Sequence, residues 1–260
     1  MNHLKLITLP FILLGFLLCT SCSDDEDLGT PLKFEKTSYE ARNNYSTAIQ
    51  LQGGSQSYSL KVENSNLLKA SILTYEAKFN PGVLSIEGLK KGTTTVTVID
   101  TKRQEEITLS IKIVDFYTSI SINESNHPVL AENQVLFIVK NPAKDFYLFQ
   151  VDEKTKEVNN KPLSRGTYEL YAVEATPYLT LTYVDETNEE TVCKLNLSEN
   201  ISPVLRYFNN YFQLDWEEWL SSKSRASLSS DFDVIMIEEG TEYKIKGDLE
   251  KDEMPDGILD

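Results

Sequence analysis

The sequence predicts a mainly β protein built from two units, and three observations support this. Apolar residues alternate with polar ones in many short runs, and Gly, Asn, Pro and Asp cluster between the runs. Net charge changes along the chain. Residues 33–115 hold 11 basic and 9 acidic side chains, whereas residues 116–260 hold 13 basic and 27 acidic ones. Such asymmetry suggests two separate units, an N-terminal β-sandwich and an acidic β-rich domain.

The chain begins with a short apolar segment. Lys5 precedes an apolar run from Leu6 to Leu18, which is shorter than the ~20 residues that a membrane-spanning helix needs. A basic start, a short apolar stretch and the small residues Thr20 and Ser21 are typical of a secretory signal peptide. We therefore predict a signal peptide over residues 1–21.

Cys22 follows those small residues, and the segment resembles a bacterial lipoprotein signal. The resemblance implies acylation of Cys22, for example with palmitate, whereas bulky residues precede the alternative Cys19. The run Ser23-Asp24-Asp25-Glu26-Asp27 resembles the export signal of Bacteroidota-type surface lipoproteins. Residues 22–32 are thus expected to form a lipidated cysteine and acidic linker. That implies an outer-membrane, lipid-anchored protein at the cell surface; a plain solvated linker is the alternative for the acidic run.

Residues 33–115 contain the clearest strand patterns. Apolar side chains alternate in Tyr58–Val62 and in Ile107–Ile113. The run Val83–Asp100, with Gly92 before a Thr/Val strand, resembles the end of a bacterial Ig-like (group 2-like) domain. The resemblance implies an Ig-like β-sandwich over residues 33–115, a fold used in stalks, adhesins and spacers.

Residues 116–260 predict sequential strands joined by short polar turns, which favours an antiparallel meander or a small lipocalin-like barrel. Strands are expected over 134–139, 146–151, 168–173, 178–184 and 191–197, with a last hairpin from Asp233 to Ile245. The acidic end from Asp248 to Asp260 is expected to fray.

One segment has helical spacing. Its apolar residues recur every three or four positions, with Ser202 as N-cap and Pro203 in the first turn. The stripe consists of Leu205, Phe208, Phe212, Trp216 and Trp219. The alternative over residues 204–220 is a hairpin that turns at Asn209-Asn210.

Aromatic residues of this segment are the candidate ligand-binding residues. Sugars stack on flat aromatic faces, and the candidates are Tyr207, Tyr211, Trp216 and Trp219. An aromatic stripe at helical spacing also fits a role in the core.

Other chemistry has little support. Cys193 fits a small buried hydrophobe better than a nucleophile, because no histidine is near it in sequence. His127 fits a solvated loop residue better than a general base. A net charge of −15 argues against nucleic acid binding. We predict no catalytic or metal-ligating residue and no cofactor.

These patterns lead us to expect a non-catalytic binding or adhesion module for a glycan or a protein partner. One alternative is a structural spacer or accessory subunit of a cell-envelope complex. The other is a carboxylate-dependent glycan-active enzyme, for which Asp215, Glu217 and Glu218 would be the first residues to consider.

Overall fold

The computed structural model describes most of the chain after its first 29 residues. The described residues are 30–74, 81–174, 176–185, 187–216, 220, 233–249 and 252–259. The predicted signal peptide, Cys22 and the acidic run lie outside them, as do Glu217, Glu218 and Trp219. Within the described residues, no helix has the length and apolar character needed to cross a membrane.

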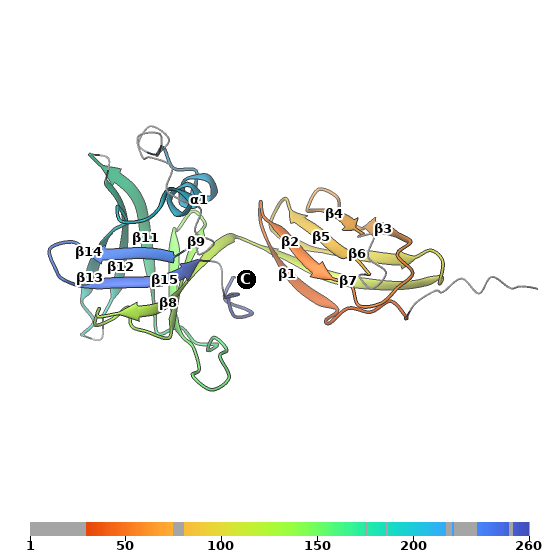
Figure 1. Cartoon of the computed structure of the whole chain (residues 1–260), viewed down its shortest axis with the longest axis horizontal. Helices are drawn as coiled ribbons and strands as arrows, with labels where there is room; N and C mark the ends of the chain where they lie inside the picture. The colour runs from red at the N-terminus through yellow and green to blue at the C-terminus, as the bar shows by residue number, and fades with distance from the viewer. Residues whose placement is uncertain are drawn as a thin grey trace, which may run out of the picture.

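The first part of the chain forms a β-sandwich of two sheets (Figure 1). One sheet has the strand order β1-β7-β6-β3 and the other β2-β5-β4, and β1 pairs with β7 in parallel. The strands are β1 (Ser38–Arg42), β2 (Ser46–Gln50), β3 (Tyr58–Val62), β4 (Leu68–Leu73), β5 (Val83–Gly88), β6 (Gly92–Asp100) and β7 (Glu105–Val114). This arrangement is the predicted Ig-like sandwich.

Alternation of side chains explains how the sandwich core forms. Val96 and Val98 of β6 and Leu109 and Ile111 of β7 are completely buried, while the residues between them remain partly accessible. Successive side chains of a strand point to opposite faces of a sheet, so each alternating run supplies one wall of the core. Leu84 and Ile86 of β5 complete the opposite wall.

The second part forms a closed, antiparallel eight-stranded barrel. Its strands follow one another around the barrel in chain order, and pairing of β15 with β8 closes it. They are β8 (Phe116–Ser125), β9 (Gln134–Lys140), β10 (Asp145–Gln150), β11 (Ser164–Val173), β12 (Thr176–Val184), β13 (Glu190–Asn196), β14 (Asp233–Glu238) and β15 (Lys244–Leu249). The predicted meander is thus confirmed, and it closes into a barrel.

Side chains fill the interior of the barrel. Phe146, Tyr168, Leu181 and Leu195 belong to one continuous apolar cluster there. Eight strands enclose a space that is about wide enough for side chains to fill. The barrel is therefore a packed scaffold.

A glycine permits close packing inside the barrel wall. A Cβ at Gly166 of β11 would lie 2.0 Å from the carbonyl oxygen of Thr182 on β12 and 2.9 Å from the Phe146 ring. Any other residue would push apart two paired strands.

The segment with helical spacing forms helix α1 (Ser202–Phe212) between β13 and β14. The hairpin alternative is wrong, because Asn209 and Asn210 are helical. The N-cap is Ile201, not the predicted Ser202, and no side chain caps the helix start. The helix ends at Phe212, where Gln213 adopts a left-handed conformation. Its apolar face joins the barrel core.

The predicted fraying of the C-terminal residues is wrong for those that the structure describes. Asp248 and Leu249 belong to β15, and residues 252–259 pack against the outside of the barrel. Met254 and Leu259 are buried in a second cluster with Tyr117 and Phe137. The cluster explains why β9 is buried on both faces: one face lines the interior and the other lies under the C-terminal segment.

Candidate binding groove at the domain junction

The sandwich and the barrel meet at a junction built around Arg42. The Arg42 guanidinium donates a hydrogen bond of 2.8 Å to the carbonyl oxygen of Tyr117 at the start of β8. It also lies 3.9 Å from the centroid of the Tyr45 ring and 5.0 Å from that of Tyr117. Both contacts are within cation–π distance. The Arg42 side chain of the sandwich thus contacts both the backbone carbonyl group and the aromatic ring of Tyr117 in the barrel.

Aromatic rings extend this junction to helix α1. Phe116 stacks on Tyr211 with ring centroids 4.9 Å apart and an interplanar angle of 5°. Tyr45 lies 5.8 Å from Phe116 and 5.7 Å from Tyr211. A residue of the sandwich therefore packs directly on the apolar cluster of the barrel.

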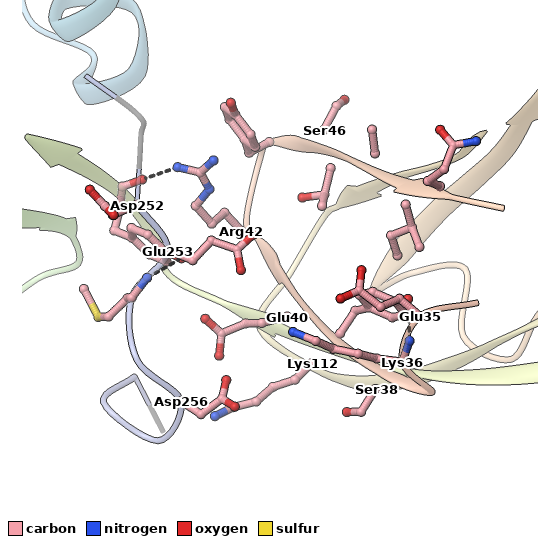
Figure 2. A pocket seen from close by; sticks show the side chains of 18 of the residues that line it. Glu35, Lys36, Ser38, Glu40, Arg42, Ser46, Lys112, Asp252, Glu253 and Asp256 are labelled. Carbon is pink, nitrogen blue, oxygen red and sulfur yellow. Dashed lines mark hydrogen bonds between the residues drawn. The ribbon is translucent and has the colours of Figure 1, made fainter. Parts of the chain in front are cut away.

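A groove of about 920 Å³ lies beside the junction (Figure 2). Strands β1 and β2 of the sandwich form one side, and the C-terminal segment of the barrel forms the other. It is lined by Glu35, Lys36, Ser38, Tyr39, Glu40, Arg42, Tyr45, Ser46, Thr47, Ala48, Ile49, Gln50, Gln52, Lys112, Tyr117, Asp252, Glu253, Met254, Asp256 and Gly257.

Charge in the groove is mixed, with acidic residues in excess. Figure 2 shows charged side chains of β1 facing those of the C-terminal segment. The acidic lining residues are Glu35, Glu40, Asp252, Glu253 and Asp256, and the basic ones are Lys36, Arg42 and Lys112. The groove therefore favours a ligand with some positive charge.

Tyr117 of β8 is a lining residue of the groove and contacts the C-terminal segment. Its hydroxyl accepts a hydrogen bond of 3.1 Å from the backbone N–H of Met254, which fixes the C-terminal segment. Burial is the main cause that raises the pKa of Tyr117 to about 12. The phenol is therefore neutral at ordinary pH and serves as a structural contact.

Strand β2 is an edge strand, and this gives the groove its recognition potential. β2 pairs with β5 and stands at the end of its three-stranded sheet. Its residues Ser46–Gln50 all line the groove. An edge strand presents backbone N–H and C=O groups with which another extended chain can pair.

The predicted ligand-binding aromatics do not form a surface platform in the described structure. Trp216 is only 3% exposed and lies in the barrel core, so its ring is inaccessible to a surface ligand. Its backbone N–H donates a 2.9 Å hydrogen bond to the Asn209 side chain. Tyr207 and Tyr211 are partly buried against the same core, and the Tyr207 hydroxyl bonds to Thr118. Trp219 is outside the described residues.

A pair of tyrosines that sequence reasoning missed lies on the outer face of the barrel. Tyr171 of β11 and Tyr178 of β12 are direct cross-strand neighbours, and their rings stack at 5.6 Å. The Lys194 Nζ atom lies 4.2 Å from the centroid of the Tyr178 ring and forms a 2.7 Å ion pair with Glu239. Outward positions of alternating strands could have suggested this pair, but only with the strand register known.

The structure brings Cys193 and His127 into contact, although they are 66 positions apart in the sequence. Cys193 is buried as predicted, but His127 is only 6% exposed, so its prediction as a solvated loop residue is wrong. The His127 Nε2 atom lies 3.6 Å from Cys193 Sγ and 3.5 Å from a carboxylate oxygen of Glu238. Burial, reinforced by the charge of Glu238, raises the pKa of Cys193 to about 12, so this thiol is not an activated nucleophile.

These three side chains form a group with metal-ligating atoms within 4.8 Å of one another. A Cys, His and Glu set suits zinc, but the hydrogen bonds of His127 oppose it. His127 Nδ1 accepts hydrogen bonds from the N–H groups of Val129 and Leu130. A neutral imidazole that binds a metal through Nε2 carries its proton on Nδ1, where it would face two donors. The arrangement therefore fits a metal poorly.

No protein-family model matches the chain, and neither does any curated protein. Among solved structures, domains 5–6 of the S-layer protein SbsC share 9% identity over 85% of this chain and 96% of that one, with a TM-score of 0.29. Domains 4 and 5 of SbsC share 10% identity over 33% of this chain, with a TM-score of 0.29. The D00–D0 domain of intimin shares 11% identity over 62% of this chain and 95% of that one, with a TM-score of 0.23.

The chain spans 45% and 25% of the length of the first two S-layer structures that it matches. A protein of unknown function from Bacteroides thetaiotaomicron VPI-5482 shares 12% identity over 65% of this chain and 46% of that one, with a TM-score of 0.23. Scores this low transfer no function from one protein to another.

Proposed function

We propose that this protein is a surface-exposed, outer-membrane lipoprotein that acts as a non-catalytic binding module for a protein partner. The observation that carries the proposal is the position of edge strand β2 along the groove at the domain junction. The partner contributes an extended segment that lies in the groove and pairs with β2. This mode obtains affinity from backbone hydrogen bonds and specificity from the side-chain pockets beside them.

Groove charge refines the partner's chemistry. Five carboxylates and three cationic side chains line the groove, so a segment that carries Lys or Arg is favoured over an acidic one. Ser46, Thr47 and Gln50 of β2 are polar, and Tyr39 and Tyr45 supply apolar contact area nearby. The segment is therefore expected to be extended, mixed in polarity and basic.

Anchoring follows from the N-terminal sequence. Lipid on Cys22 and the acidic run Ser23–Asp27 would place the sandwich next to the membrane and the barrel beyond it. Acyl chains contribute about 0.8 kcal/mol per buried CH₂ group, so several chains on one cysteine hold a protein stably. In this proposal the sandwich serves as a stalk, and the groove is exposed on its far side.

Selection from a random-peptide library against the full chain tests the groove. We expect selected peptides to be enriched in Lys and Arg and to lose at least about tenfold in affinity for Ala48→Arg, which adds bulk and positive charge on β2. Thr167→Arg is the matched control, because Thr167 is exposed on the barrel and the added charge is the same. Peptides that bind Ala48→Arg as tightly as the unchanged chain would contradict the groove as the site.

The tyrosine pair supports a second candidate, the binding of a glycan on the barrel. Tyr178 is only 9% exposed, so the partly accessible Tyr171 ring, beside the Lys194–Glu239 ion pair, would supply the apolar area and hydrogen-bonding groups. A glycan array probed with the full chain and with Tyr171→Ala separates the candidates. Glycan binding that disappears in Tyr171→Ala favours this second function. Absence of both peptide and glycan ligands favours a spacer instead.

Anchoring has its own test. Cys22→Ala should abolish labelling by a palmitate analogue and release the protein from membranes. Replacement of Asp24, Asp25, Glu26 and Asp27 by Ala should retain the label but reduce cleavage by an added protease at the cell surface. Label on Cys22→Ala would refute the anchor, and unchanged surface cleavage would make the acidic run a simple linker.

A further inference from the structure

The loop between β8 and β9 closes the barrel end that lies away from the sandwich. This end also contains the start of β13, the end of β14 and the turn before β15. The loop inserts Leu130, which is 3% exposed, into the apolar cluster of the barrel, and Val129 packs against that cluster. The loop therefore covers the apolar interior at this end of the barrel, and we call Val129 and Leu130 its plug.

His127 holds this plug in place through its side chain. Its Nδ1 atom accepts a 3.0 Å hydrogen bond from the N–H of Val129 and a 2.9 Å hydrogen bond from the N–H of Leu130. The backbone N–H of His127 donates to Ser125 Oγ, which in turn donates to the carbonyl oxygen of Leu130. The residues that enter the core are thus positioned by a ring nitrogen that must carry no proton.

The opposite edge of the ring fixes the neutral tautomer. With Nδ1 accepting two hydrogen bonds, the proton of the neutral ring is on Nε2, which faces the Glu238 carboxylate at 3.5 Å and Cys193 Sγ at 3.6 Å. Protonation would add a hydrogen to Nδ1 that points at two N–H donors. Both bonds would break, and the loop would lose its connection to the ring.

We propose that the loop of residues 126–133 is an acid-sensitive latch, in which protonation of His127 at Nδ1 releases Val129 and Leu130 and opens the outer end of the barrel. This inference is independent of the groove. His127 is also the only histidine after residue 3, and histidine is the side chain that ordinarily titrates between pH 5 and 8.

The charged and titratable groups around His127 act in opposite directions. Burial lowers the pKa of His127, and the Glu238 carboxylate on β14 opposes that shift. Cys193 on β13 stays neutral, because its pKa is raised to about 12. Tyr183 on β12, whose pKa is raised by burial and by Cys193 and Glu238, stays neutral as well. The Tyr243 ring packs edge-on against His127 at 5.3 Å.

The expected size of the effect follows from proton linkage. A released His127 has an ordinary pKa of about 6.5, whereas the closed loop excludes the proton. Lowering the pH to 5 then increases the open population by up to about 30-fold, and most of the change occurs below pH 6.5. Above pH 7 the latch stays closed.

Hydrogen exchange of the full chain at pH 7.5 and pH 5, corrected for the intrinsic pH dependence of exchange, tests the latch. Protection of residues 126–133 should fall about 10- to 30-fold at pH 5. Thr187 and Glu189 lie at the same barrel end, their N–H groups donate to the Asp185 carboxylate, and their protection should not change. Equal protection of the loop at both pH values would overturn the proposal.

Two substitutions make the test specific to His127. The side-chain oxygen of Asn can accept hydrogen bonds from the same two backbone N–H groups, but Asn does not titrate. His127→Asn should therefore keep the loop protected from exchange at both pH values. Glu238→Gln removes the charge that favours the protonated ring in the closed loop. The closed loop then excludes the proton more strongly while the released ring keeps its ordinary pKa, so the loss of protection at pH 5 should be at least as large as in the unchanged chain. A loop in His127→Asn that still opens at pH 5 would assign the acid response to another group.

Discussion

Arg42 of the sandwich donates a 2.8 Å hydrogen bond to the backbone carbonyl of Tyr117 in the barrel. This contact joins a charged donor to an acceptor that no side-chain substitution can remove. Arg42 also lies beneath the ring of Tyr45, so the same side chain connects the two domains and orders one wall of the groove.

Arg42→Ala should therefore weaken the coupling between the domains. Hydrogen bonds to charged groups contribute about 1.5–3 kcal/mol, and partial exposure reduces this, so we expect a loss of about 1–2 kcal/mol. Urea unfolding followed by tyrosine fluorescence measures it. Arg165→Ala on the exposed face of β11 is the control and should change little. Equal effects of the two substitutions would show that the junction is not stabilised by Arg42.

Trp216→Ala should cost about 3–5 kcal/mol, because it removes a large buried side chain from the barrel core. That is a large share of the stability of a typical domain, so thermal unfolding of the barrel should shift strongly downward. Val192→Ala is the surface control, since Val192 is 58% exposed, and should stay within about 0.5 kcal/mol. A normal melting temperature for Trp216→Ala would contradict the core position of the ring.

Gly166→Ala should destabilise the barrel by about 1–3 kcal/mol or more, because the added methyl group would overlap the Thr182 carbonyl oxygen of the neighbouring strand. Gly240→Ala provides a contrast. It has open space around its Cβ position and loses only backbone freedom at a φ of 78°, which costs about 1–2 kcal/mol. Chemical denaturation of both variants measures the difference. A larger loss for Gly240→Ala would show that strand spacing tolerates the methyl group.

Alkaline pH should destabilise the fold through Tyr117. Its pKa is about 10 in the unfolded chain and is raised to about 12 in the folded one. The folded state therefore retains a proton that the unfolded state loses, and stability falls as the pH rises from about 10 to 12. Tyr117→Phe should show a shallower loss above pH 10 in urea titrations at successive pH values. Identical slopes for the two proteins would place the alkaline sensitivity elsewhere.

Local patterns were sufficient to predict the strands, a β-sandwich and, in the second domain, an antiparallel meander or a small barrel; the Ig-like form of the sandwich was implied by a resemblance. Apolar residues alternate with polar ones around Val96, Val98 and Ile111, which indicates a strand with one buried face. The buried faces of such strands form the core of the sandwich. Helical spacing of Leu205, Phe208 and Phe212 likewise predicted α1. The helix end at Phe212 was missed, because Gln213 is not a usual left-handed residue.

The groove and the latch could not be predicted, because both depend on residues that are distant in sequence. His127 and Cys193 are 66 positions apart, and their contact requires the barrel to close. Tyr117 meets the backbone of Met254 across 137 positions. The prediction that the acidic end frays failed for the same reason: its composition indicates solvation, whereas burial of Met254 and Leu259 depends on the outer face of β9.

Closure of the barrel by β8 and β15 has a consequence for the order in which the two domains fold. All strands of the sandwich are complete at Val114, whereas the Ser121–Asp248 pairing requires the chain as far as β15. A chain that is synthesised from its N-terminus can therefore fold the sandwich early, while the unfinished barrel keeps two open edges that favour aggregation. The slow, long-range closure step is the stage at which the chain is most exposed to aggregation.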